Sequence, residues 1–423
     1  MNNFKLLTLL LFALFIATCS TRLGAQENEL CFDCHNDPEL TGATGDTLYV
    51  DSKKWTASIH NRMELECVSC HMDLAGFDDW PHPEHLEKVD CSICHDEAYE
   101  LWQQGIHGLQ AQAKGDLDAA GCAACHGSHY IMAVDEASSL VYPTNLPHTC
   151  LNCHGDPGLA DKHEGMGRAE VAGMYLESVH GKALEKSGLV ISATCSSCHG
   201  SHKIPSLEDF YPRIPEICGS CHAGIYEDYL QGVHGSAFVE GNRDVPICTD
   251  CHGEHNIRDS GDPESTINPR TVAETCSHCH EDMALSRKYG LPVGRLESYR
   301  STYHGIALNL GDISVANCGS CHGYHNVRAS SDPKSSIHPA NLASTCGKCH
   351  PNAGENFATG KIHVQDSPQE NILAWLIKRA YLIFISGLIG GFIAYICIDL
   401  VAHRRRKRSV GKERMNGGEG PER

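Results

Sequence analysis

Residues Cys318-Gly319-Ser320-Cys321-His322 form a C-x-x-C-H motif. Two thiols at this spacing can add to the two vinyl groups of one porphyrin, and the histidine that follows can bind the iron from one face. The motif occurs eleven times and uses 22 of the 24 cysteines, so that only Cys19 and Cys397 lie outside it. The sequence therefore predicts eleven covalently bound c-type haems.

We number these predicted sites 1 to 11 in chain order. Their cysteines are Cys31 and Cys34, Cys67 and Cys70, Cys91 and Cys94, Cys122 and Cys125, Cys150 and Cys153, Cys195 and Cys198, Cys218 and Cys221, Cys248 and Cys251, Cys276 and Cys279, Cys318 and Cys321, and Cys346 and Cys349. The predicted proximal iron ligands are His35, His71, His95, His126, His154, His199, His222, His252, His280, His322 and His350. A zinc half-site, a redox dithiol or a disulfide would not need a histidine after every pair.

Second (distal) ligands are expected among the sixteen histidines that remain once His403 of the basic tail is set aside. Those that recur between motifs are His60, His107, His180, His234, His304 and His363, and those that recur in C-H-G-x-H are His129, His202, His255 and His325. One more is expected from residues 80–85. There we favour His85 over His82, because two prolines flank His82 and restrict its backbone.

The count gives one distal histidine for each iron. His148, His163, His278 and His338 do not recur, and we expect them to be surface residues or to support the ligands. A histidine three positions after a proximal ligand cannot easily reach the far face of the same iron, so each C-H-G-x-H histidine should serve a neighbouring haem. We assign His363 to the last site, together with His350. Two imidazoles at every iron would leave no position for a substrate, which favours an electron carrier over an enzyme.

The haem region is an internal repeat. Units begin at Cys31, Cys91, Cys150, Cys218 and Cys276, and a half unit begins at Cys346. The segments between motifs are short and broken by Gly and Pro, which indicates small helices and turns and no sheet. Residues 164–181 and 295–307 are the expected longer helices. The predicted fold is mainly α with extensive loops, an elongated cytochrome repeat domain with a haem-dominated core, plus one C-terminal transmembrane helix.

Composition agrees with a core supplied by porphyrin. Aromatic residues make up only 7 % of the 423 residues, and there are 40 glycines. We therefore expect the chain without haem to be largely unfolded. Between Gln26 and Asn371 there are 22 Lys+Arg and 49 Asp+Glu. This charge disfavours nucleic acid and favours either basic protein partners or simple solubility.

The two ends of the chain predict export and anchoring. Residues 1–25 read as a signal peptide, with lipidation of Cys19 as an alternative. Ala380–Ile398 lacks charge within a predicted transmembrane helix at 372–403, and five basic residues open the tail at 404–423. By the positive-inside rule the tail is cytoplasmic, and the haem domain at 26–371 is periplasmic, at the bacterial inner membrane. Gly387 and Gly391 could seat a partner helix.

The C-H-G-x-H repeats, Lys288-Tyr289-Gly290-Leu291-Pro292 and Ser301-Thr302-Tyr303-His304-Gly305 resemble the membrane-anchored multihaem c-type cytochromes of bacterial respiration, which carry doubled C-x-x-C-H motifs. The resemblance implies electron relay between the quinone pool, directly or through a b-type membrane partner, and periplasmic redox proteins. The known quinol dehydrogenase cytochromes have their helix at the N-terminus, so no quinol site is carried over. The alternatives are a multihaem oxidoreductase of the nitrite, hydroxylamine or tetrathionate type, and a haem-bearing subunit of a larger respiratory complex.

Overall fold

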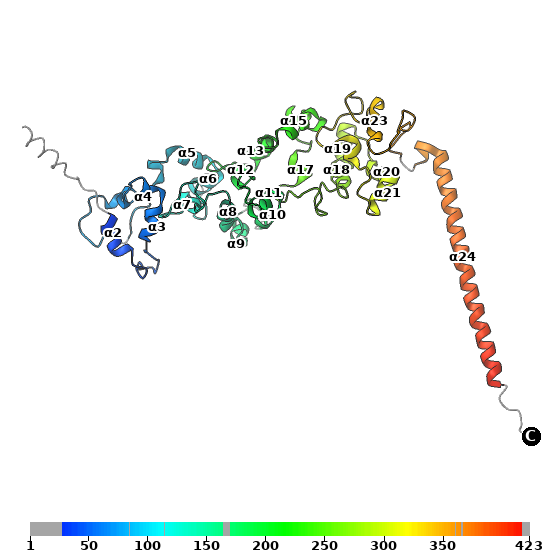
Figure 1. Ribbon diagram of the computed structural model, residues 1–423, viewed down its shortest axis with the longest axis horizontal. Coiled ribbons are helices and arrows are strands. Elements are labelled where there is room, and N and C mark those ends of the chain that lie inside the picture. Colours follow the sequence, from blue (N-terminus) through cyan, green and yellow to red (C-terminus); the bar gives the residue numbers. More distant parts are fainter. Residues whose placement is uncertain are drawn as a thin grey trace, which may run out of the picture. The chain divides into compact units, whose positions relative to one another are not determined.

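The computed structural model describes residues 28–83, 85–113, 115–163, 170–359, 361–364 and 367–416. The predicted signal peptide, the start of the predicted helix at 164–181 and the last seven residues of the tail lie outside this part. The chain divides into two compact units. We call residues up to 268 together with 325–327 the N-terminal module, and residues 269–324 together with 328 onward the C-terminal module. Each is described by itself (Figure 1).

Both modules consist of short helices joined by turns, which confirms the predicted fold class. Within the described residues there is no strand, only an isolated antiparallel bridge between Thr41 and Thr47. The helices of the N-terminal module are α2 (Asn28–His35), α3 (Ser52–Ala57), α4 (Ile59–Arg62), η1 (Cys67–Ser69), η2 (Met72–Leu74), η3 (Cys91–Ile93), α5 (Asp96–Gln104), α6 (Ile106–Ala113), α7 (Cys122–His126), α8 (Leu146–His154), α9 (Pro157–Lys162), α10 (Val171–Glu177), α11 (Val179–Glu185), α12 (Cys195–His199), α13 (Leu207–Phe210), η4 (Tyr211–Arg213), α14 (Ile214–Gly219), α15 (Ala223–Gln231), α16 (Val233–Val239) and α17 (Cys248–His252). Those of the C-terminal module are α18 (Val272–His280), α19 (Met283–Tyr289), α20 (Arg295–Arg300), α21 (Tyr303–Asn309), α22 (Cys318–His322), η5 (Pro339–Asn341), α23 (Leu342–Gly347) and α24 (Pro368–Asn416).

A broken helix pair recurs before the second motif of each full unit. The two longer helices predicted from sequence are each such a pair, so the prediction of single helices was wrong. Ser178 leaves helical geometry at ψ 167°, and its Oγ accepts a hydrogen bond from the backbone N–H of Gly181 at 3.0 Å. Thr302 does the same for Gly305 at 3.2 Å. A capping side chain therefore ends one helix and starts the next.

In four of the five pairs, the sharp angle requires a glycine just after the between-motif histidine, whereas Asn61 follows His60 in the first unit. A Cβ placed on Gly181 would lie 2.1 Å from the carbonyl oxygen of Tyr175, and one on Gly305 would lie 2.3 Å from that of Tyr299. Both distances are shorter than any real contact, so only glycine lets the second helix cross the end of the first. This crossing fixes the direction in which the histidine leaves the second helix.

Backbone hydrogen bonds join each helix pair of the N-terminal module to a distant segment. In each bond the donor is the backbone N–H of the residue just before a between-motif histidine. The acceptor is the backbone carbonyl oxygen of the residue two positions after a C-H-G-x-H-type histidine. The four bonds are Ile59 to Ile131 at 2.8 Å, Ile106 to Ile204 at 2.8 Å, Val179 to Ile257 at 2.8 Å and Val233 to Val327 at 2.7 Å. Two predicted distal ligands from different parts of the chain are thereby held side by side.

The protein core is small. Buried apolar side chains in the described residues are few, and the one packed cluster joins Ala273, Tyr299 and Leu308 in the C-terminal module. Such a core offers little apolar burial for a chain of this length, which is consistent with a bound group supplying the rest.

The last helix differs from all others. α24 has a non-helical residue, Asn371, near its start, and continues through Asn416. Its segment Asn371–Arg408 has a mean hydropathy of 2.2 over an apolar window and is not buried, and by length and composition it could cross a membrane. It includes the transmembrane segment expected from sequence.

Candidate haem-binding sites

At ten of the eleven sites the proximal histidine faces a second imidazole. The ring centroids lie 5.8–6.3 Å apart. The pairs, in site order, are His35 with His82, His71 with His129, His95 with His60, His126 with His202, His154 with His107, His199 with His255, His222 with His180, His252 with His325, His322 with His363, and His350 with His304.

This spacing fits an iron between the two rings. An imidazole nitrogen binds a metal at about 2 Å and lies about 1 Å from its ring centre, so two imidazoles on opposite sides of one metal have centroids about 6 Å apart. With two cysteines beside each proximal histidine, the residues fit c-type haem, which they would hold by two thioethers and two axial nitrogens.

The pairing follows a rule of exchange between neighbouring repeat units. A between-motif histidine faces the first proximal histidine of the next unit, as His180 does with His222. A C-H-G-x-H histidine faces the second proximal histidine of the previous unit, as His255 does with His199. At these sites neighbouring units thus exchange ligands, and no C-H-G-x-H histidine faces its own motif. The expectation that these histidines serve a neighbour matches this geometry.

At site 1 the structure favours a different ligand from the sequence. His82, and not His85, faces His35, with centroids 5.9 Å apart and rings within 7° of parallel. The flanking prolines restrict the backbone but leave the ring able to reach His35. His82 Nδ1 lies 2.8 Å from the Pro83 carbonyl oxygen, which turns Nε2 towards the site, whereas His85 is exposed. We therefore revise the proposed ligand from His85 to His82.

Sites 10 and 11 also depart from the expected assignment. We expected His363 at site 11 beside His350, but His350 faces His304, and His363 faces His322 of site 10. His363 Nδ1 lies 2.9 Å from Ser298 Oγ, which orients its ring. The reason is the exchange rule: in this sequence no further C-H-G-x-H follows to serve site 10, and the segment at 361–364 takes that place. His234 keeps its place in the repeat and remains the proposed distal ligand for the iron not yet assigned.

Glycine also sets the direction of the chain after the C-H-G motifs. Gly200 has φ 79° and ψ 176°, and Gly323 has φ 82° and ψ 168°, a region that essentially only glycine occupies. The chain turns away from the proximal histidine at this point. The next histidine therefore points to another iron.

Burial favours the neutral form of several of the facing imidazoles. Burial, and after it the facing ring, lowers the pKa of His107, His252 and His322. A lowered pKa leaves these rings uncharged near neutral pH, with a lone pair free to bind a metal.

Aromatic residues anchor the first helix of four helix pairs, and the between-motif histidine lies on the second helix of each pair. The Tyr175 hydroxyl donates to the Ala193 carbonyl at 2.9 Å, and Tyr229 and Tyr299 donate in the same way to Pro246 and Ala316, at 3.1 and 3.0 Å. In an earlier unit the Trp102 indole N–H donates to the Ala120 carbonyl at 2.9 Å. Burial raises the pKa of Tyr299 to about 12, so the hydroxyl stays a donor.

We missed these anchors in the sequence. The signal is present, because an aromatic residue lies five positions before each of five between-motif histidines: Trp55, Trp102, Tyr175, Tyr229 and Tyr299. Trp102, Tyr175, Tyr229 and Tyr299 each tie their helix pair to the segment just before the second motif of their unit.

Successive sites lie next to one another within each module. In every full unit the first cysteines of the two motifs are within hydrogen-bonding distance: Cys31 and Cys67, Cys91 and Cys122, Cys150 and Cys195, Cys218 and Cys248, and Cys276 and Cys318. From one unit to the next, burial and then the neighbouring thiols Cys346 and Cys349 raise the pKa of Cys321. The same holds for Cys198 beside Cys218 and Cys221.

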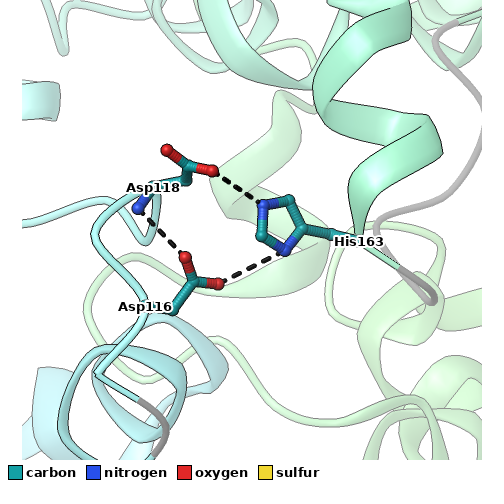
Figure 2. Close-up of side chains that lie close together, drawn as sticks. All are labelled: Asp116, Asp118 and His163. Atoms are coloured by element: carbon teal, nitrogen blue, oxygen red, sulfur yellow. Dashed lines mark hydrogen bonds and ion pairs between the residues drawn. The ribbon is translucent and has the colours of Figure 1, made fainter.

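Three of the histidines that do not recur have polar partners instead of a facing proximal ring. His148 Nε2 lies 3.2 Å from Glu185, and His338 Nδ1 accepts from the Ala340 N–H at 3.2 Å. Figure 2 shows His163 between two carboxylates, with Nδ1 3.3 Å from Asp116 and Nε2 3.1 Å from Asp118. Lys162 also pairs with Asp118, and the network joins α9 to the loop after α6.

Family comparisons agree with this geometry. Residues 59–155 match the family model "Cytochrome c3", and residues 188–225 match the model "Doubled CXXCH motif". No solved structure matches the chain.

The curated relatives are cytochromes by name. The chain is 23 % identical to "Multiheme cytochrome MtrA" of Shewanella baltica over 55 % of this chain and 62 % of the relative. It is 27 % identical to "Cytochrome c-type protein NrfB" of Escherichia coli over 40 % of this chain and 78 % of the relative. It is 21 % identical to "High-molecular-weight cytochrome c" of Nitratidesulfovibrio vulgaris over 70 % of this chain and 51 % of the relative. The chain thus spans less than two thirds of two of these relatives. With its repeated C-x-x-C-H motifs and facing imidazoles, the chain is a multihaem c-type cytochrome.

Proposed function

We propose that this chain is an electron-transfer protein that binds eleven c-type haems and relays electrons between the membrane and periplasmic redox partners. The observation that carries the proposal is the set of ten facing imidazole pairs, arranged so that successive sites adjoin within each module. Haem at these sites supplies reversible one-electron chemistry at iron.

The residues around each site support transfer and not catalysis. Two imidazoles take both axial positions, so a substrate has no open position to bind. The glycine and aromatic residues described above help to fix where the between-motif rings lie, and burial lowers the pKa of several of the facing imidazoles. The protein therefore contributes spacing, burial and tuning of potential.

We place the entry point for electrons at the membrane side. Site 11 is the last motif before α24, and only residues 351–367 separate His350 from that helix. The five basic residues from Arg404 support a cytoplasmic tail, with the haem region in the periplasm. The electron donor is the quinone pool, reached directly or through a membrane partner.

Full-length protein in native membranes tests the relay. In membranes that contain the chain, menadiol should reduce its haem irons, as followed by their absorbance. A membrane-impermeant oxidant added on the periplasmic side should then reoxidise these haem irons. Membranes without the chain are the control. Absence of menadiol-driven reduction, with dithionite still reducing the haems, would contradict entry from the quinone pool.

A further inference from the structure

We infer that the surface formed by Asp73, Asp78, Asp79, Trp80 and Glu87 is the docking site for a basic redox protein that exchanges electrons at site 1. We call this surface the acidic cap. The inference rests on the proposed electron relay, and it names the class of partner and the place of contact.

Aromatic rings connect the acidic cap to the ligand of site 1. The Trp80 ring packs edge-on against His82, with centroids 5.6 Å apart, and His82 stacks on His35 at 5.9 Å. Phe77 packs edge-on against the other side of this group, 5.6 Å from Trp80. Trp80 is nevertheless 37 % exposed, so a partner that covers it would lie one ring away from an iron ligand. A large, partly exposed aromatic residue is a common anchor at protein interfaces.

Carboxylates lie close to this tryptophan in the sequence. Asp73, Asp78, Asp79 and Glu87 are all exposed. Asp73 accepts a hydrogen bond from the Glu87 N–H at 2.9 Å, which places the two ends of the loop side by side. Throughout the described ranges, no salt bridge reaches any of these four carboxylates. Their charge is therefore available to a partner.

The charge of the repeat units is uneven. Residues 31–90 contain 13 Asp+Glu and 4 Lys+Arg, whereas residues 276–345 contain 5 and 6. A partner with a basic face is therefore attracted to the first unit and not to the fifth. Charge complementarity of this kind steers encounter and raises association rates, and salt weakens it.

The acidic cap is also the place where the first unit departs from the repeat. Apart from site 10, which faces His363, the sites served by a neighbouring unit receive a ligand from a helix or C-H-G-x-H segment of that neighbour. Site 1 instead receives His82 from a loop of its own unit, and no C-x-x-C-H precedes Cys31 in this sequence. The loop thus leaves site 1 facing solvent through Trp80.

The test uses full-length, haem-loaded protein in detergent and a small lysine-rich single-haem cytochrome c as the probe. The variant Asp78→Asn/Asp79→Asn removes two charges from the acidic cap. The matched control, Glu227→Gln/Asp228→Asn, removes two exposed charges from α15. Stopped-flow mixing gives the second-order rate at which each reduced protein reduces the oxidised probe, at low and high ionic strength. Ferricyanide serves as an acceptor that needs no docking site.

At low ionic strength the cap variant should react about three- to tenfold more slowly than wild type, and the control less than twofold more slowly. The difference should vanish at high salt. Carbodiimide should cross-link probe lysines to peptides that contain the cap carboxylates. Equal slowing by both variants would show that overall charge attracts the probe, and unchanged rates would show no role for the cap; either result overturns the inference. If wild type failed to reduce ferricyanide as well, the electron-transfer function itself would be contradicted.

Discussion

At the residue scale, a histidine can be a proximal or a distal iron ligand, and the C-x-x-C-H motif identifies only the proximal ones. Proximal residues can be read directly from C-x-x-C-H, and so can the recurring positions of most distal candidates. Which iron a distal histidine serves depends on contacts between segments up to about 75 residues apart, such as His252 with His325. The choice of His82 over His85 depended on where a loop folds back, which local sequence rules about proline do not determine.

The first prediction concerns this choice. His82→Ala should convert site 1 to a five-coordinate or water-bound, high-spin iron, because it removes the ring that faces His35. His85→Ala should leave every iron low-spin. Electronic absorption and ferric EPR spectra of the two purified variants, at equal haem content, make the comparison. A high-spin signal from His85→Ala alone would restore the ligand that the sequence favours.

A second prediction tests the exchange between units. His325→Ala should produce one high-spin iron at site 8, whose proximal ligand lies 73 positions earlier in the sequence at His252. His148→Ala is the control, since that ring pairs with Glu185 on the surface. Reduced protein should then bind carbon monoxide at about one equivalent in the first variant only. No binding by His325→Ala would argue against this ligand.

At the element scale, a broken helix pair, a glycine and an aromatic anchor present the between-motif histidines His107, His180, His234 and His304. The short helices and the lack of a sheet could be predicted from the frequent Gly and Pro. The breaks at Ser178 and Thr302 were not predicted, because the sequence pattern was interpreted as one continuous helix across each capped interruption. Both residues are good N-caps followed by a histidine and a glycine, and that local pattern now explains the break.

A third prediction tests the helix crossing. Gly181→Ala places a methyl group 2.1 Å from the Tyr175 carbonyl oxygen and should destabilise the local structure by about 2 kcal/mol or more. Gly224→Ala is the control, because a Cβ there meets nothing within 4 Å. Thermal loss of the low-spin spectrum should begin at lower temperature in Gly181→Ala than in wild type. Equal melting of the two variants would mean that the crossing tolerates a side chain.

At the scale of the whole molecule, ligand exchange makes each repeat unit depend on its neighbours, as expected for repeat proteins. Removing one unit should therefore disturb ligation in the units on both sides. The number of attachment motifs and the long apolar helix near the C-terminus were evident from sequence. The distal ligands of sites 1 and 10 were not evident, because His82 and His363 stand in places that between-motif or C-H-G-x-H histidines fill at the other sites.

A fourth prediction concerns topology. The basic residues after the apolar part of α24 should keep the tail in the cytoplasm and the haem region outside. Protease added to intact spheroplasts should digest the haem region and leave an epitope tag on the C-terminus detectable in a membrane-protected fragment. A protected haem region would reverse the orientation.

The most direct measurement is quantitative low-temperature EPR of the fully oxidised wild-type protein, with haem content determined on the same sample. If every iron lies between two histidines, all ferric spins should be low-spin and no high-spin signal should exceed the background of damaged protein. A high-spin ferric signal near one equivalent per chain would contradict this ligation, and would indicate an open iron at which a substrate could bind.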